Sequence, residues 1–351
     1  MSSQRLAGDE RQALRLLYEH RLLRVMRRRE LSIAVALGLP FGPAGSQTAA
    51  TPRYRIGYLE LSTELTTASR IQVFKESFKD FGFIEGRDYL FETRFADNRG
   101  ERLQRLAEEL VSAKPDLLMA HATSPTRALQ SVTKSIPIVM TASGDPLGGG
   151  LVKSLARPGG NITGTSNSLT DLASKNLDLL HATLPHVTKV AVLFYPAYPA
   201  HVSVVGTLRQ SAPKVQMQML PIAIDSVDEI PRGVALASTQ KADALIVVTD
   251  PTFVEQRRQI AELALAGRMP SIGYAAEYAD AGFLIGYGPD PFWFYRRSAY
   301  FAARILKGAS PADMPVEQPT KFELAVNLRT ARALGIGVPR STLLQADRVI
   351  E

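Results

Sequence analysis

DLLMAHATSPT, residues 116–126, places a short apolar run directly before the start of a helix. The run Asp116–Ala120 is typical of a buried strand. Ser124 is suited to the N-cap of a helix that we predict over 124–134, and Pro125 to its first position. A strand that turns into a helix is the repeating unit of a parallel sheet covered by helices, so this segment predicts an α/β fold.

The same alternation continues on both sides of this segment. In the first half we expect strands at 55–59, 89–95, 116–120 and 136–141 and helices at 68–81, 101–113 and 124–134. A second series has strands at 189–194, 215–222, 243–248 and 270–274 and helices at 170–184, 201–212 and 251–266. The tail adds strands at 283–287 and 322–327 and helices at 291–306 and 330–334. Two such series predict two Rossmann-like lobes, each a parallel sheet flanked by helices.

The chain is long enough for two lobes, and its composition shows no strong bias. It has 351 residues, of which 45% are apolar and 21% charged, so it can bury a sizeable core. Residues 1–50 hold eight arginines and four acidic residues, and the 33 basic and 30 acidic residues that remain leave a net charge of only +3. This balance argues against a nucleic-acid partner, for which a basic groove would be expected.

The first 50 residues have the order of a secretory signal. Three arginines at 27–29 precede the apolar run 31–39, and small residues follow up to Ala50. We expect translation to start at Met26 and cleavage to occur near Ala50, so that 1–50 is an N-terminal extension and signal peptide. The alternative is an amphipathic helix that stays attached.

Cysteine is absent from the sequence, and this narrows both chemistry and location. Disulfides, thiolate metal sites, a thiol nucleophile and a lipid-anchored N-terminal cysteine are all excluded. The apolar segments that follow the signal are too short to form a transmembrane helix. We therefore expect a periplasmic protein that is secreted by a cleavable signal peptide and is not lipid-anchored.

Hydroxyl-bearing residues follow two strands expected in the first half. Thr123 and Ser124 stand at a helix start, and Ser62 and Thr63 lie in the loop after the first strand. Helix starts attract carboxylates and phosphates, and open α/β sheets bind ligands at the carboxyl ends of their strands. We predict that all four residues bind the ligand. A plain capped helix and a solvated loop are the alternative interpretations.

In the second half, one carboxylate and several aromatic residues lie at or near the ends of expected strands. Asp250 precedes a helix and is a candidate N-cap, but in a closed cleft it would need a partner such as a ligand ammonium. Four tyrosines at or near strand ends can sandwich a ligand, with core packing as the alternative: Tyr195, Tyr198, Tyr274 and Tyr287. Asp145 lies in a glycine-rich loop that fits neither phosphate-binding template; we place this loop near the cleft and predict that Asp145 binds the ligand.

Motifs for catalysis, metal binding and cofactor binding are missing from the sequence. It contains no G-x-S-x-G, no H-E-x-x-H and no close histidine pair, so we predict no catalytic residues, no metal site and no cofactor. His121 is the one histidine at a strand end beside the expected cleft, and a structural role is its alternative. A competing enzyme hypothesis would pair His121 with Asp145 or Asp250 as acid and base on a small carboxylated substrate.

Several long ordered motifs together resemble one known family. They are DP at 145–146, GGGLVKSLARPGGNITG at 148–164, YGPD at 287–290, RILKG at 304–308, PVEQPTKFE at 315–323 and ADRVIE at 346–351. In these the chain is similar to the ABC transporter substrate-binding proteins related to tryptophan-import binding proteins. The similarity covers essentially all of residues 54–351.

The resemblance implies a type I periplasmic binding fold, in which three crossovers join two lobes around a ligand. We place the crossovers near Gly164, near Gly282 and around 311–316. The expected N-lobe and C-lobe are then 54–163 plus 282–312, and 164–281 plus 313–351.

The resemblance also implies the function. The chain is expected to be the extracytoplasmic solute-binding component of an ABC importer, a monomer that closes on a small molecule and presents it to permease subunits in the inner membrane. The residues above suggest a carboxylated organic ligand, either an amino acid or an aromatic acid. Relatives often carry Asn where 194–199 has Tyr, which makes the expected pocket more aromatic and puts amino-acid specificity in doubt. A ligand-binding sensor for a membrane kinase is the alternative function.

Overall fold

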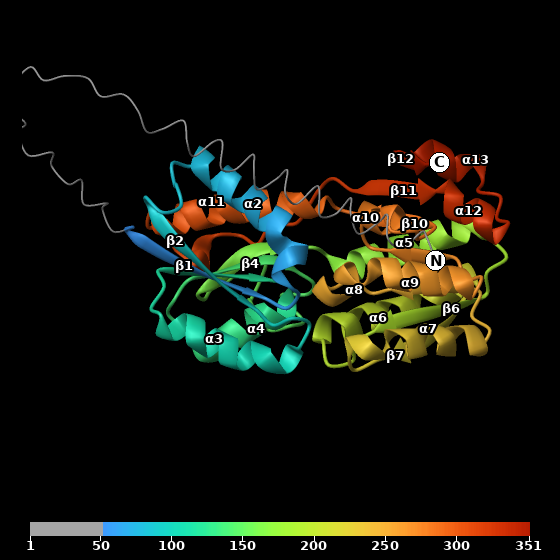
Figure 1. Cartoon of the computed structure of the whole chain (residues 1–351), viewed down its shortest axis with the longest axis horizontal. Helices are drawn as coiled ribbons and strands as arrows, with labels where there is room; N and C mark the ends of the chain where they lie inside the picture. Colours follow the sequence, from blue (N-terminus) through green and yellow to red (C-terminus); the bar gives the residue numbers. More distant parts are fainter. Residues whose placement is uncertain (1–51) are drawn as a thin grey trace, which may run out of the picture. The chain divides into compact units, whose positions relative to one another are not determined.

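The computed structural model describes residues 52–351, which form two β-sheets (Figure 1). The expected signal peptide lies outside the described residues. The first sheet has the strand order β2 (Tyr89–Phe95), β1 (Tyr54–Glu60), β3 (Leu117–His121), β4 (Ile138–Ser143) and β5 (Ile162–Ser166). The second has the order β12 (Arg348–Ile350), β11 (Glu323–Asn327), β10 (Ile285–Gly288), β9 (Ser271–Gly273), β8 (Ala244–Val247), β6 (Lys189–Phe194) and β7 (Gln218–Ala223). We call these sheets, with their helices, the N-lobe and the C-lobe.

Helices cover both faces of each sheet. In the N-lobe, one face carries α2 (Glu64–Asp80) and α11 (Pro291–Leu306) side by side, and the other carries α3 (Leu103–Ser112) and α4 (Thr123–Val132) (Figure 1). In the C-lobe the two pairs are α5 (Leu169–Thr183) with α6 (Pro199–Ser211), and α7 (Ile230–Thr239) with α9 (Arg257–Ala266). The shorter helices are α8 (Pro251–Glu255), α10 (Ala276–Asp280), α12 (Leu328–Leu334) and α13 (Arg340–Gln345), and 3-10 turns occupy Gly100–Arg102, Ala212–Val215, Val227–Glu229 and Pro311–Asp313.

Strand β6 shows why these residues form this architecture. Successive side chains of a strand point to opposite faces, so Val190 and Val192 pack beneath α5 and α6 while Ala191 and Leu193 pack beneath α7 and α9. All four side chains are fully buried. A parallel strand covered on both faces needs such a continuous apolar run, and the strand predicted at 189–194 is confirmed.

The chain passes between the two lobes three times. It leaves the N-lobe after β5, returns to it from β10 through α11, and leaves it again before β11. The first and third crossings run side by side. The N–H of Ser166 donates to the carbonyl of Glu317 at 2.9 Å, and the N–H of Glu317 donates to the carbonyl of Gly164 at 2.9 Å. These bonds join two crossings into one hinge segment.

The crossing predicted near Gly282 is wrong in position. Strand β10 pairs in parallel with β9 and antiparallel with β11, so residues 285–288 belong to the C-lobe sheet. The chain crosses only between Gly288 and Pro291, where α11 begins. An apolar strand looks the same in either lobe, and the sequence pattern therefore could not place it. The C-lobe sheet is also mixed rather than wholly parallel, because β11 and β12 run opposite to the other strands.

Smaller differences concern element ends. Residues 162–166 form a strand that the sequence pattern did not predict, and the helix predicted at 251–266 is divided into α8 and α9 at Gln256. Ala122 rather than Ser124 occupies the N-cap position of α4.

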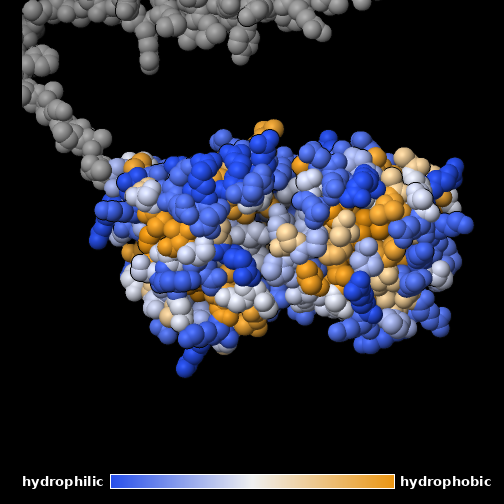
Figure 2. Space-filling view, turned by 90° about the horizontal axis from the view of Figure 1, so that it is seen from below, coloured by the Kyte–Doolittle hydropathy of each residue, from blue (hydrophilic) through white to orange (hydrophobic). Residues whose placement is uncertain are grey.

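The surface seen in Figure 2 is mainly hydrophilic, and its hydrophobic residues lie in separate patches. Within residues 52–351, Leu65, Leu344 and Val202 are the most exposed large apolar side chains. Single apolar side chains are common on protein surfaces. None of the helices in this part of the chain combines the length and apolarity needed to cross a bilayer.

Gly164 is a hinge residue at which a side chain has no room. Its φ is +132°, and an added Cβ would lie 2.1 Å from the carbonyl oxygen of Met140 in β4. We predict that Gly164→Ala lowers the free energy of unfolding, measured by urea denaturation, by about 3 kcal/mol through backbone strain and displacement of β4. Gly206→Ala in α6 is the control, since a Cβ there meets none of the described atoms within 4 Å. Equal stability of the two variants would contradict the close approach.

Candidate ligand-binding site

A pocket of about 850 Å³, counted with the solvent space at its mouth, lies between the two lobes. Residues that end or follow β1, β3, β4 and β5 line it from the N-lobe, and residues that follow β6, β8, β9 and β10 line it from the C-lobe. The carboxyl ends of parallel strands are where open α/β sheets bind their ligands.

Half of the predicted ligand-binding residues line this pocket. They are Thr123, Ser124, Tyr198, Asp250 and Tyr274. Contact between any of them and a ligand stays a prediction. The residues that lie outside the pocket lining are Ser62, Thr63, Asp145, Tyr195 and Tyr287.

Two of the residues outside the pocket lining form hydrogen bonds from one lobe to the other. The hydroxyl of Thr63 donates to Glu255 of α8 at 3.0 Å. Asp145 accepts from the N–H of Gly148 at 2.8 Å and from the hydroxyl of Ser203 in α6 at 3.0 Å. Neither Thr63 nor Asp145 is part of the pocket lining.

The other outlying residues are occupied by packing. Tyr195 stacks on Phe253 with ring centres 4.6 Å apart. Tyr287 stacks on Phe322 at 6.0 Å, on the core side of the C-lobe sheet. Ser62 is buried just after the end of β1, and its hydroxyl has no hydrogen-bond partner within residues 52–351. Successive side chains at a strand end point alternately toward the pocket and toward the core. The residue type alone does not tell which direction a side chain takes.

Three buried polar atoms at the pocket have no hydrogen-bond partner within residues 52–351. They are Oδ2 of Asp250, the hydroxyl of Tyr274 and Oδ1 of Asn167. Each unsatisfied buried group costs about 1–3 kcal/mol, and native structures leave few of them. Two of the three are acceptor oxygens, so a ligand that carries N–H donors would satisfy them.

Asp250 caps α8, as the sequence predicts, and keeps one oxygen free. Its Oδ1 accepts from the N–H of Phe253 at 2.7 Å. Burial raises the pKa of Asp250 to about 7, against the lowering effect of hydrogen bonds from the Phe253 and Thr252 amides. His201 lies 3.9 Å away, but burial lowers the pKa of His201 to about 3, so this imidazole is neutral and forms no ion pair. Within residues 52–351, the free oxygen, Oδ2, has no hydrogen-bond partner.

The N-lobe wall combines a helix start with strained backbone. Ala122 and Ala142 line the pocket with φ of +70° and +55°, a conformation that costs a non-glycine residue about 1–3 kcal/mol and is concentrated at binding sites. The longer helices α4, α5, α6 and α11 also begin at the pocket. Their N-termini bring partial positive charge and free N–H groups toward one space, which favours an anionic ligand group.

Polar contacts hold the lobes together around the pocket. Glu255 in α8 accepts from the hydroxyl of Thr63 and from the side-chain amide of Asn98, each at 3.0 Å. Arg70 in α2 pairs with Glu277 in α10 at 2.9 Å, and its side chain is only 8% exposed. These interlobe contacts form only when the lobes meet.

Several pocket residues were not found from the sequence. They are Arg70, Asn167, His201, Glu277 and Tyr295. Asn167 follows the strand that was not predicted, and knowing that strand would have revealed it. Arg70 and Glu277 carry no sequence signal, because each lies on a helix and meets its partner only after both lobes have folded.

A family model described as "ABC transporter substrate binding protein" matches residues 66–350. The chain belongs to this family. The tyrosine-binding protein of Clostridioides difficile (strain R20291) is 30% identical over 261 residues, which are 74% of this chain and 75% of that protein. The fold predicted from the sequence and the family resemblance are thereby confirmed.

Two solved structures extend the comparison. An ABC domain in complex with L-Trp from Streptococcus pneumonia is 25% identical and has a TM-score of 0.78, covering 85% of this chain and 100% of that chain. A ligand-free, open substrate-binding protein from Clostridium difficile is 26% identical and has a TM-score of 0.62, covering 85% and 99%. As an ABC transporter substrate-binding protein, this chain is the extracytoplasmic solute-binding component of an importer. Among residues 52–351, no three His, Asp or Glu side chains are grouped to hold a metal ion.

The raised pKa of Asp250 predicts a pH-dependent stability. The native state keeps this proton up to about pH 7, whereas the unfolded chain loses it near pH 4, so ionisation of Asp250 lowers the free energy of unfolding as pH rises between these values. We predict that Asp250→Asn gains at least about 1.4 kcal/mol relative to wild type between pH 4.5 and 7.5, the equivalent of one pKa unit. Urea denaturation at several pH values measures this difference.

Asp243→Asn is the matched control for this experiment. Burial raises the pKa of Asp243, but hydrogen bonds from Thr188 and Lys189 outweigh it and lower the pKa. Asp243 therefore titrates below the tested window, and its variant should differ from wild type by a constant amount. If the Asp250→Asn difference is equally constant, the raised pKa is refuted.

Proposed function

We propose that this protein captures a small carboxylated organic molecule in the pocket between its lobes and delivers it to an ABC permease. The observation that carries this proposal is the set of three unpartnered buried atoms, on Asp250, Tyr274 and Asn167, at the edge where several helices begin. Such a pocket offers acceptors for a donor group and positive helix ends for an anion.

The pocket chemistry favours an amino acid or an aromatic acid. The start of α4, with the Ser124 hydroxyl, is a seat for a carboxylate. Asp250 is a partner for an ammonium, which would hold it ionised despite burial. Apolar and aromatic side chains supply walls for the ligand body: Leu169, Leu172, Tyr198 and Phe294. The relatives named above, one called tyrosine-binding and one holding L-Trp, support this ligand class.

Closure of the lobes on the ligand is the proposed signal to the permease. The contacts of Glu255 with Thr63 and Asn98, and of Arg70 with Glu277, join the lobes beside the ligand space. The TM-score is higher against the L-Trp complex than against the open, ligand-free structure at nearly equal sequence identity. This supports a closed arrangement of the lobes, and ligand binding would stabilise that form because the ligand contacts both.

The location and partners follow from the same function. We propose a monomer in the periplasm that is released by cleavage of the signal at 1–50 and docks on permease subunits in the inner membrane. The basic, apolar and small segments before Ala50 support secretion.

A thermal-shift screen of the mature protein tests the ligand class. We predict that amino acids or aromatic acids stabilise it, by about 2.7 kcal/mol at one hundred times the dissociation constant. Asp250→Ala and Tyr198→Ala should lose the effect. Tyr287→Ala, whose ring packs outside the pocket, should melt lower but keep the ligand-induced shift. Stabilisation only by sugars or uncharged compounds would show that the ligand class is wrong.

Secretion in a two-membrane bacterium tests the location. The protein recovered from the periplasm should have a mature N-terminus near Ala50 by intact-mass measurement, because the small residues there suit a signal peptidase. An intact N-terminus on protein in the cytoplasmic fraction would contradict the proposal.

A further inference from the structure

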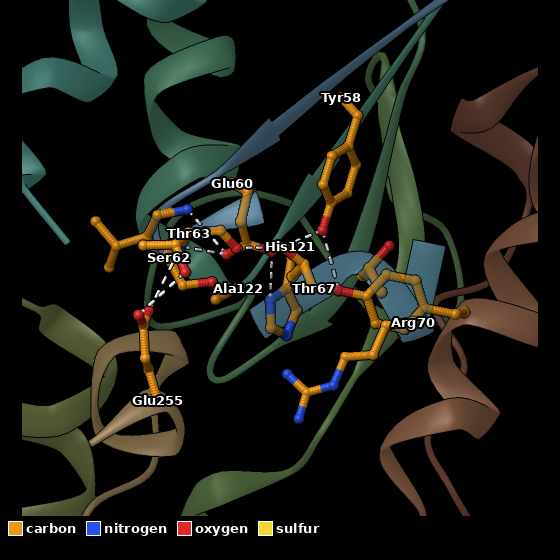
Figure 3. Close-up of polar contacts among 12 residues, drawn as sticks. Tyr58, Glu60, Ser62, Thr63, Thr67, Arg70, His121, Ala122 and Glu255 are labelled. Atoms are coloured by element: carbon orange, nitrogen blue, oxygen red, sulfur yellow. Dashed lines mark hydrogen bonds and ion pairs between the residues drawn. The ribbon is translucent and has the colours of Figure 1, made fainter. Parts of the chain in front are cut away.

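The N-lobe wall of the pocket contains a buried chain of hydrogen bonds that the proposed function has not used (Figure 3). Glu60, at the end of β1, is completely buried. Its Oε2 accepts from the hydroxyl of Tyr58 at 2.6 Å and from Nδ1 of His121 at 2.9 Å. The hydroxyls of Tyr58 and Tyr295 lie 3.0 Å apart. Because Tyr58 donates to Glu60, Tyr295 must donate to Tyr58, and the chain ends at one carboxylate.

Glu60 is ionised despite its burial. Burial by itself raises the pKa of Glu60, but attraction to His121 and hydrogen bonds from His121, Tyr58 and the Ser62 amide outweigh it and lower the pKa. Its other oxygen, Oε1, accepts from the N–H of Leu61 at 2.9 Å. A buried carboxylate with this many donors is an acceptor only, so Nδ1 of His121 carries a proton.

His121 therefore directs its second nitrogen, Nε2, to the pocket. The His121 side chain lines the pocket and is 12% exposed. Figure 3 shows this nitrogen on the side of the ring away from Glu60. Within residues 52–351 it forms no hydrogen bond with the protein. The ring packs on Tyr295 with centres 5.7 Å apart, which fixes its orientation.

Arg70, the arginine in the pocket lining, is already paired. Arg70 donates to both oxygens of Glu277, at 2.9 and 3.2 Å. His121 also lies two residues before the start of α4, beside the strained Ala122 and the half-buried Ser124. Nε2 and the helix start thus approach the same part of the pocket.

We propose that Glu60 and His121 form a carboxylate–imidazole dyad that anchors the anionic group of the ligand. The imidazolium Nε2–H donates to a ligand carboxylate, and Glu60 stabilises the positive ring from behind. The inference rests on the proposed function, because it assigns a residue to the carboxylate of that ligand.

Other ionisable groups also face this part of the pocket. They are Tyr58 and Glu60 from β1, Arg70 from α2, Tyr295 from α11, Glu277 from α10 and Asp250 at the start of α8. Burial raises the pKa of Asp250 to about 7, so its charge also affects carboxylate binding, and each variant is compared with wild type at one pH. The ratio of dissociation constants between a His121 variant and wild type removes that contribution, because Asp250 is present in both.

Isothermal titration calorimetry with L-tyrosine, L-tryptophan and benzoate as probes tests the dyad. For a probe that binds wild type, His121→Gln should raise the dissociation constant at least tenfold at pH 6. Glu60→Gln should also raise it, because the imidazole ring loses the carboxylate behind it. His186→Gln, at an exposed position outside the pocket lining, is the control and should match wild type.

The outcomes separate this inference from the proposed function. A ratio near one would refute the anchor while leaving capture of carboxylates intact. If wild type binds uncharged molecules and none of the three probes, the ligand class itself falls and the anchor falls with it. Should His121→Gln misfold because Glu60 is left buried without a cation, the double variant Glu60→Gln, His121→Gln removes both charges and must show at least the same loss of affinity.

Discussion

The direction of the strands is the constraint on which the rest of the structure depends. In each lobe the parallel strands end at the same edge, and each is followed by a loop and usually a helix start, so chain ends of the N-lobe and the C-lobe face one pocket. Free N–H groups, partial positive charge and short polar loops gather there. Apolar strands buried on both faces hold these loops in fixed positions. The residues whose chemistry can vary are therefore those in the loops at the pocket.

In the proposed function, each lobe contacts a different part of the ligand. The N-lobe supplies the start of α4 and the Glu60–His121 pair, which suit an anion. The C-lobe supplies the free oxygen of Asp250, which suits a donor. A molecule with both groups would contact both lobes, and that is the condition under which binding favours closure. Glu255 and Glu277 then add contacts between the lobes that the ligand does not need to provide.

The regular part of the fold was predictable because its residues obey local rules. Strands at 89–95 and 189–194 and the helix at 291–306 match the structure residue for residue, since their apolar periodicity is clear at both ends. Asp250 was identified as a cap because capping is decided within three residues.

The site was only partly predictable because it depends on contacts between distant segments. The lobe to which β10 belongs is decided by its neighbours β9 and β11, and the Gly282 crossing was misplaced for that reason. Glu60 lies in an apolar strand. Its role can be inferred only from its contact with His121, which follows 61 residues later. Tyr195 and Tyr287 have the right residue type at strand ends, but their rings pack away from the pocket.

The central claim is that two lobes close on a ligand held between them, and small-angle X-ray scattering of the mature protein tests it most directly. Curves are recorded without ligand and with a saturating compound that stabilises the protein in the thermal-shift screen. The account predicts a smaller radius of gyration with the compound, because the ligand favours the form in which both lobes contact it. Identical scattering curves at saturation, with binding verified by calorimetry on the same sample, would contradict it.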